Sequence, residues 1–259
     1  MNPEIQLQVR PQLREPALVM SFEGWNDAGG AASTALSFVA RAIQSVPLAE
    51  ISGEEFIDYT VHRPTVRMTD DEARIIEWPR TEFRYGPIDA HRELVVGLGI
   101  EPHLRWQHFA DLVSEFVLEL GIRQVVLLGA YLADVVYSRP VGVSGFSSHP
   151  ERLAELGVLP SRYEGPTGIV GVLADRFRCD GVEVASLWAA LPHYINAAPN
   201  HRGALALVQQ LNALVGIKMD EEPLRKEAAA CEQRIATTVS EDPDLTEYVR
   251  QLKRREFTQ

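Results

Sequence analysis

The sequence predicts an α/β protein whose open, largely parallel mixed sheet is flanked by helices. A short apolar run over residues 17–22 is followed by a small-residue helical pattern over 28–43. Apolar runs over 93–99 and 123–129 then enclose an amphipathic helical pattern over 106–120. A strand–helix–strand crossover of this length normally makes a parallel, right-handed pair, so we expect the last two runs to pair with each other.

The segment between these two units, residues 49–88, has a weaker pattern. Short β-like pieces at 65–68 and 73–78 are separated by prolines, which predicts an excursion of strands and loops. The alternation then returns. It predicts a strand, a helix, a strand and a helix over 142–147, 168–178, 182–190 and 202–215.

The chain changes character after Gly216. Charged helical patterns over 223–236 and 243–257 each carry a narrow apolar stripe. Such stripes are typical of an antiparallel helical hairpin that packs on something else, either the core or another subunit. The sequence therefore divides into an α/β core, residues 1–216, and a C-terminal helical extension, residues 217–259.

The composition limits the classes of partner that we expect the protein to bind and the cellular compartment in which we expect it. The formal net charge of -11 opposes nucleic acid and an anionic membrane surface as main partners, because both need a concentrated basic face. No run approaches the roughly 20 apolar residues that cross a bilayer, and residues 1–16 lack the apolar core of a secretory signal. Cys179 and Cys231 stand far apart, without the spacing of a disulfide framework or a zinc site. We expect a cytoplasmic protein with reduced thiols.

Ligands of open α/β sheets usually bind beyond the carboxyl ends of the strands, so the loops there hold the candidate residues. The first such loop, residues 23–30, holds Glu23, Asn26 and Asp27 beside the free N–H groups of a helix start. Two alternatives stay open for this loop. Its polar groups line a ligand site, or Asp27 caps the helix while the glycines allow tight packing.

Two further regions supply candidates. Tyr131 and Asp134 stand where the chain leaves the strand at 123–129. Thr167 lies in the turn before a predicted helix, and His193 follows a predicted strand. Histidine changes protonation near neutral pH, so His193 is the most attractive titratable group. For all four residues, ordinary turn chemistry and structural hydrogen bonds are the alternative to a role in ligand binding.

Several apparent motifs lack the required spacing. Residues 142–146 place a glycine one position early for a nucleophile elbow. Residues 165–171 have neither the Rossmann glycine spacing nor the lysine of a phosphate loop. His103 and His108 are five positions apart, which does not align them on one helix face for a metal ion. We therefore expect no metal and no cofactor, and the catalytic residues of any reaction are unknown.

Four segments in order resemble the PAC2 (proteasome assembly chaperone 2) family. They are Phe22–Gly29, Leu128–Val135 with Ser138–Pro140, Tyr163–Ile169 and Ser186–Tyr194. The resemblance covers residues 16–255 and implies a phosphorylase/hydrolase-like α/β core and a tendency to form homo-oligomers. It also implies, for chaperone members, assistance in the assembly of proteasome core particles. Some members dock a C-terminal tail with a penultimate tyrosine, and this chain ends at 257–259 without that tyrosine.

Together these observations favour a non-catalytic, oligomeric, chaperone-like interaction protein. Its expected partners are copies of itself and proteasome subunits. A shared fold does not transfer an activity, so a second hypothesis is kept: a small-molecule hydrolase/phosphorylase-like enzyme, or a metabolite sensor, that uses the strand-end cleft. Its polar lining would be Glu23, Asn26, Asp27, Tyr131 and His193.

Overall fold

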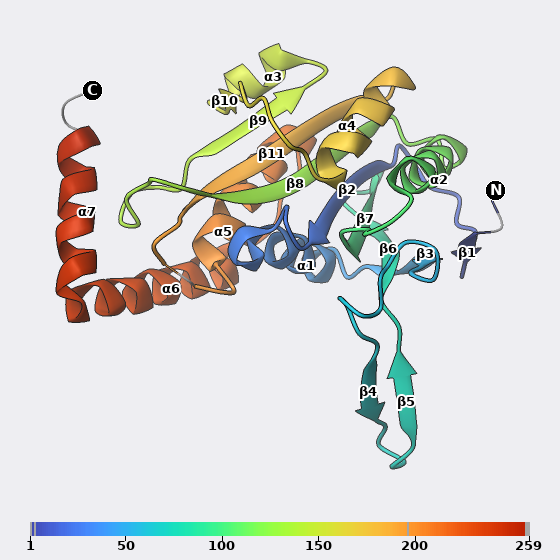
Figure 1. Cartoon of the computed structure of the whole chain (residues 1–259). Coiled ribbons are helices and arrows are strands. Elements are labelled where there is room, and N and C mark those ends of the chain that lie inside the picture. Colours follow the sequence, from blue (N-terminus) through green and yellow to red (C-terminus); the bar gives the residue numbers. More distant parts are fainter. Residues whose placement is uncertain (1, 3, 196, 257–259) are drawn as a thin grey trace.

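The computed structural model describes residues 2, 4–195 and 197–256, and a nine-stranded sheet runs through their centre (Figure 1). The strand order is β1-β3-β6-β7-β2-β8-β11-β9-β10. These strands are β1 (Ile5–Leu7), β2 (Ala17–Glu23), β3 (Val46–Ser52), β6 (Arg80–Pro87), β7 (Glu93–Ile100), β8 (Gln124–Ala133), β9 (Val143–Ser147), β10 (Leu159–Pro160) and β11 (Glu183–Pro192). The mixed, largely parallel sheet that the sequence predicts is confirmed.

The four central strands, β7, β2, β8 and β11, are parallel to one another. The direct pairing of β7 with β8 that the sequence predicts is wrong, because β2 lies between them. Val19 of β2 stands opposite Val96 on one side and Val126 on the other. Residues 17–22 are buried throughout, so β2 suits the middle of a sheet that is covered on both faces. The carboxyl ends of all four strands therefore meet at one edge.

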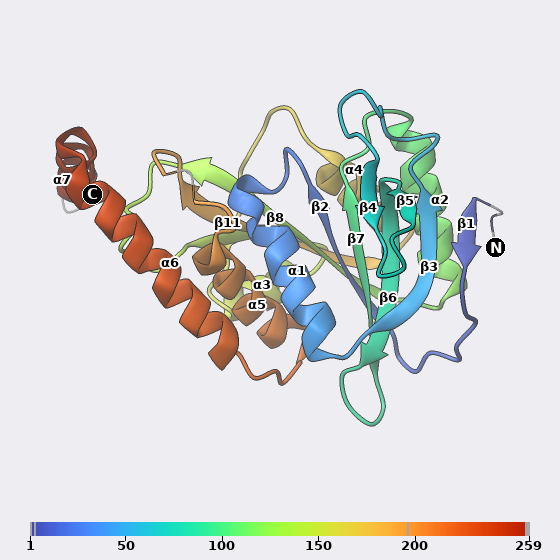
Figure 2. The same ribbon diagram turned by 90° about the horizontal axis from the view of Figure 1, so that it is seen from below.

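Helices cover both faces of this central part (Figures 1 and 2). On one face α1 (Ala31–Ala42), entered through the 3-10 turn η1 (Ala28–Gly30), packs with α5 (His201–Val215). On the other face α2 (Trp106–Glu119) packs with α4 (Ile169–Cys179). Each helix buries the apolar side of its periodic pattern, which gives one core layer on each face of the sheet.

Residues 49–88, expected as an excursion of strands and loops, contribute to two sheets. β3 and β6 extend the large sheet in antiparallel fashion. β4 (Thr65–Met68) and β5 (Arg74–Glu77) instead pair with each other as a separate two-stranded sheet. We call residues 65–77 the arm, because this hairpin projects from the body of the molecule (Figure 1). Further along, the sequence pattern does not predict α3 (Pro150–Glu155), which is too short for a clear periodicity.

The C-terminal helices are α6 (Glu222–Glu241) and α7 (Pro243–Glu256), but the predicted antiparallel hairpin is wrong. α7 turns steeply away from α6 instead of running back along it (Figures 1 and 2). A single residue, Asp242, follows α6 with an extended backbone (φ -114°, ψ 109°), and this connection is too short for a reversal. The apolar stripes of both helices meet around Val136, in the connection between β8 and β9.

Two further expectations concern the C-terminal tail and the crossing of a membrane. Residues 257–259, on which the expectation for the tail rests, lie outside the described residues. Within the part that the structure describes, each helix is too short or too polar to traverse a bilayer.

Candidate functional site

The candidate residues lie near the carboxyl ends of β2, β8 and β11 and near the start of α4. The structure corrects the position of one of them. β8 continues to Ala133, so Tyr131 belongs to the strand and not to the loop after it. The strand is longer because Tyr131 and Ala133 stay in parallel register with Ala190 and Pro192 of β11.

Asp27 caps helix α1. Its carboxylate accepts hydrogen bonds from the backbone N–H groups of Ala32, at 2.6 Å, and Ser33, at 3.2 Å. The chain reaches this geometry through Gly29 and Gly30, whose φ angles are +58° and +62°. Burial raises the pKa of Asp27, while its hydrogen bonds with Ser33 and Ala32 oppose the rise. Both carboxylate oxygens are therefore engaged by the helix that follows.

Asn26 is fully buried and faces Glu101, a residue that the sequence analysis did not select. Its Nδ2 donates to Glu101 Oε1 over 2.6 Å, and the same oxygen accepts the backbone N–H of Ile169 over 2.9 Å. Ile169 is the first residue of α4, so the carboxylate lies at the positive end of this helix. The sequence held one signal for Glu101: it directly follows a central strand, as Glu23 ends another.

The space around this contact is closed by Gly168. A Cβ atom at this position would lie 2.2 Å from Asn26 Oδ1 and 2.6 Å from Glu101 Oε1. The φ of Gly168 is -96°, which any residue adopts, so the site requires glycine for space and not for backbone conformation. Asn26 Oδ1 has no hydrogen-bond partner within the described residues.

Asp134 and His193 lie together in a second cluster, with Tyr248 of α7. His193 Nε2 lies 2.8 Å from Asp134 Oδ1 and 2.9 Å from Tyr248 Oη. Tyr248 Oη donates to Asp134 Oδ1 over 3.1 Å. Loss of solvent around the phenol and then its bond to Asp134 raise the pKa of Tyr248, so the hydroxyl keeps the proton that it donates. The Tyr248 ring also packs edge-on against Tyr194, 5.2 Å between centroids. This cluster attaches α7 to the ends of β8 and β11.

The remaining candidates do not join either cluster. The side chains of Glu23, Tyr131 and Thr167 are exposed, and among the described residues no hydrogen bond links them to another candidate. Two large aromatic side chains are close in sequence to the two sides of the Asn26–Gly168 contact. Trp25 precedes Asn26 and is 62% exposed, and Tyr163, in the loop that leads to Gly168, is 66% exposed.

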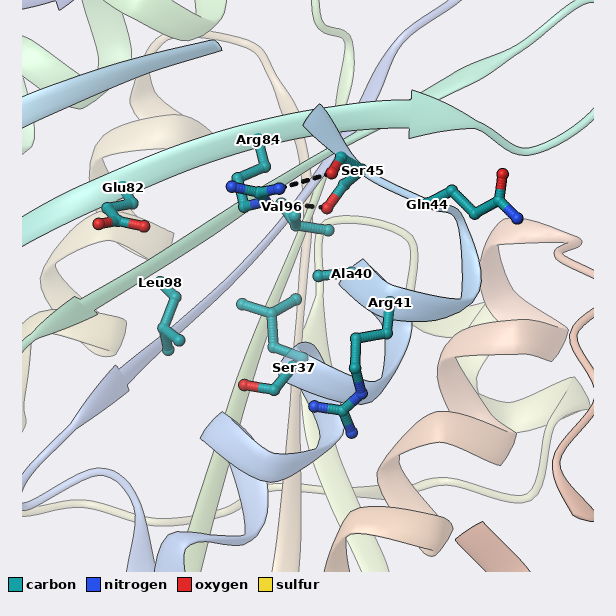
Figure 3. Close-up of a pocket in the computed structure, with 10 residues that line it drawn as sticks. Ser37, Ala40, Arg41, Gln44, Ser45, Glu82, Arg84, Val96 and Leu98 are labelled. Carbon is teal, nitrogen blue, oxygen red and sulfur yellow. Dashed lines mark hydrogen bonds between the residues drawn. The ribbon is translucent and has the colours of Figure 1, made fainter. Parts of the chain in front are cut away.

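Five cavities of the described surface lie away from these residues. One of about 350 Å³ opens between α1 and strands β6 and β7, above Val96 and Leu98 (Figure 3). Beside it Arg84 donates to the carbonyl oxygen and the hydroxyl of Ser45, at 2.6 and 3.1 Å. The described residues that line this cavity and the four others include none of the candidates. The described residues contain no group of three His, Cys, Asp or Glu side chains placed to hold a metal ion.

Known proteins similar to the chain share both its sequence pattern and its fold. A PAC2 family protein from Streptomyces avermitilis is 38% identical, with a TM-score of 0.83 over 90% of this chain and 99% of the other. A proteasome-assembly chaperone homologue from Mycobacterium tuberculosis is 37% identical, with a TM-score of 0.82 over the same shares of 90% and 99%. The comparison with curated proteins gives no significant match.

A more distant structure shares the fold alone. PbaB, an archaeal proteasome activator from Pyrococcus furiosus, is 19% identical over 90% of this chain and 97% of its own, with a TM-score of 0.71. The model of the PAC2 family matches residues 21–239, which is most of the chain. This match and the identities of 38% and 37% to PAC2-type structures show that the chain belongs to the PAC2 family.

Proposed function

We propose that the chain is a non-catalytic, chaperone-like interaction protein that assists the assembly of a proteasome-like complex and acts as a homo-oligomer in the cytoplasm. The 37% identity to a proteasome-assembly chaperone homologue supports the class of partner. We also propose that the chain consists of an α/β core, residues 1–216, and a C-terminal helical extension, residues 217–259. Limited proteolysis tests this division, and we expect the first cleavage near residue 217. Fractionation of cells that express the tagged chain tests the compartment, and we expect the chain in the cytoplasmic fraction.

One observation carries the proposal: at the carboxyl edge of the sheet, the carboxylates of Asp27 and Glu101 are engaged internally while aromatic side chains are exposed. The carboxylates of Asp27 and Glu101 bind the first turns of α1 and α4. Trp25, Tyr131 and Tyr163 are 62%, 40% and 66% exposed at the same edge. Tyrosine and tryptophan are enriched at protein–protein interfaces relative to the rest of a protein surface, so their exposure here favours binding of another protein.

The test is capture of purified proteasome core-particle subunits from the same organism by the immobilised full-length chain. Trp25→Ala should weaken capture at least about tenfold, since buried aromatic anchors dominate interface energies. Leu118→Ala is the matched control, because Leu118 is an apolar residue, 52% exposed, at the far end of α2. Absence of capture by the unmodified chain would overturn the proposal. Equal losses of capture in both variants would mean that the carboxyl edge of the sheet is not the surface that binds the proteasome subunits.

A second candidate function is a small-molecule hydrolase/phosphorylase-like enzyme or a metabolite sensor. The observation in its favour is the buried Oδ1 of Asn26, a hydrogen-bond acceptor that has no partner within the described residues. A thermal-shift screen against nucleosides, nucleotides, phosphate and common metabolites tests it, because a ligand of the native state raises the apparent stability. A shift that Glu23→Gln abolishes would favour this function over the interaction protein.

A further inference from the structure

The arm, residues 65–77, has one exposed apolar face. Its two strands pair Val66 with Ile76, and Met68 lies on the same side because side chains alternate along a strand. Val66, Met68 and Ile76, which we call the apolar face, are 50%, 61% and 56% exposed. Arg74, opposite Met68, is exposed on the same side, at the end of the face that is nearer the tip. Trp78, directly after β5, is 49% exposed. The structure thus holds a strip of large apolar side chains away from the core.

The opposite face of the arm is different in character. There Arg67 Nε and Glu77 Oε2 form an ion pair of 2.5 Å between diagonal positions of the two strands, since Arg67 stands opposite Ile75. Ile75 is the large apolar side chain of this face, and it is 44% exposed. The arm is therefore amphipathic, with an ion pair on one side and, on the other, three large apolar side chains beside a single charge, Arg74. A hairpin with this pattern buries its apolar face against a partner.

The base of the arm is attached to the body. The ring of Tyr59 lies 5.0 Å from that of Trp78, between centroids. His62 Nδ1 lies 3.1 Å from His103 Nε2, in the loop after β7, and the two rings are stacked. A two-stranded hairpin is only marginally stable in water by itself. These contacts hold the arm outward from the sheet (Figure 1), so its apolar face is presented to another molecule.

The two ends of the arm carry opposite charges. The turn at its tip contains Asp70, Asp71 and Glu72, three consecutive exposed carboxylates. Arg63, just before β4, is exposed at the base, and within the described residues it takes part in no ion pair. If two arms pack face to face about a two-fold axis and run in opposite directions, each acidic tip meets the Arg63 of the other copy. A surface that complements itself in this way is what a symmetric homodimer requires.

We propose that the arm is a self-association element: the apolar faces of two copies pack against each other in opposite directions, with each acidic tip at the base of the other arm. The apolar contact supplies the affinity, and the charges fix the orientation. This inference rests on the homo-oligomer of the proposed function and adds the surface that forms it. A second copy is favoured over an unlike partner because the same arm carries both the apolar face and the two opposite charges.

The test compares two neighbouring residues on opposite faces of the arm. The full-length chain and its Ile76→Glu and Ile75→Glu variants are studied by sedimentation velocity over a range of concentrations. Ile76→Glu should raise the dissociation constant of the dimer at least about tenfold, because it removes a large apolar side chain from the centre of the contact and replaces it with a carboxylate. Ile75→Glu should leave it nearly unchanged. Both residues are exposed in the single chain, and circular dichroism checks that both variants are folded.

The outcomes separate this inference from the proposed function. If the unmodified chain is monomeric at all concentrations, the homo-oligomer of the proposed function fails, and the arm contact fails with it. If the chain associates but Ile76→Glu associates equally well, the arm contact alone is overturned. If Ile76→Glu keeps the oligomer but loses capture of proteasome subunits, a proteasome subunit covers the arm and the self-association is again overturned.

Charge reversal tests the orientation of the two arms. Arg63→Glu and Asp71→Arg should each weaken association, and the double variant should regain most of the loss because it restores the attraction with the signs exchanged. The effect of each single change should shrink as salt is added, as expected for exposed charges. A double variant that is no better than the weaker single variant would overturn the antiparallel arrangement.

Discussion

Asn26 Nδ2 and Glu101 Oε1 lie 2.6 Å apart and join the carboxyl ends of two neighbouring parallel strands, β2 and β7. The same Glu101 oxygen accepts the N–H of Ile169, so one carboxylate satisfies a buried amide and a free donor of helix α4. Hydrogen bonds to an ionised acceptor are stronger than those between neutral groups. We therefore regard this contact as the main polar support of the edge on which the candidate residues lie.

Removal of the Glu101 carboxylate should destabilise the protein. Glu101→Ala leaves both donors unpaired, and we expect a loss of about 1–3 kcal/mol in the free energy of unfolding in urea. Glu101→Gln keeps a neutral acceptor, so its loss should be smaller. Glu23→Gln serves as the control, since the Glu23 side chain is exposed and forms none of these bonds. Equal stability of Glu101→Ala and the unmodified chain would contradict the structural role.

The glycine at this contact should not tolerate a methyl group. Gly168→Ala places a Cβ within 2.2 Å of Asn26 Oδ1, and overpacking of this kind typically costs about 1–3 kcal/mol. Gly142→Ala is the control, because a Cβ there meets no atom within 4 Å. Urea unfolding of both variants measures the difference. A Gly168→Ala variant as stable as Gly142→Ala would mean that α4 can move away from Asn26.

The central elements could be predicted because their patterns are long and regular. The run that ends at Leu98 and Gly99 and the helix that follows it are examples. Strand order was not predictable in the same way, because no local periodicity records that β2 inserts between β7 and β8. The angle between α6 and α7 depends on Asp242 and on the packing around Val136, and the stripes on the two helices carry information about neither.

The candidate site was predictable where its contacts are local. Asp27 bonds to Ala32 and Ser33, five and six residues further on, and the sequence analysis included this cap as an alternative. Glu101 and Tyr248 were missed because their partners are remote. Glu101 is 75 positions from Asn26, and Tyr248 is 55 positions from His193. Only the order of the strands and the turn between α6 and α7 bring them together.

The buried carboxylate of Asp27 should leave a signature in the pH dependence of stability. Burial raises the pKa of Asp27 from its ordinary 3.8, so the folded state holds this proton to higher pH than the unfolded state does. Between the two pKa values the folded state binds more protons, and the free energy of unfolding falls as the pH rises. This contribution of Asp27 is complete below 3.8 and is lost as the pH passes the raised pKa.

Comparison with Asp27→Asn isolates the effect, since the variant has no such group to titrate. The free energy of unfolding of the unmodified chain minus that of Asp27→Asn should decrease as the pH rises from 3.8 through the raised pKa of Asp27. Urea unfolding at several pH values within this range measures the difference. A difference that grows with pH would mean that the hydrogen bonds to Ala32 and Ser33 outweigh burial and lower the pKa instead.

The cluster of Asp134, His193 and Tyr248 should govern the attachment of α7 and not the stability of the core. Tyr248→Ala removes two hydrogen bonds and the ring contact with Tyr194, whereas the sheet and its helices keep their own packing. Amide hydrogen exchange should therefore speed up in residues 243–256 and stay unchanged in the central strands, because local opening needs less free energy than global unfolding. Gln251→Ala, an exposed change on the same helix, should alter neither region. Unchanged exchange of α7 in Tyr248→Ala would show that Val249 and Leu252 alone hold this helix, and the polar cluster would then be free for another role.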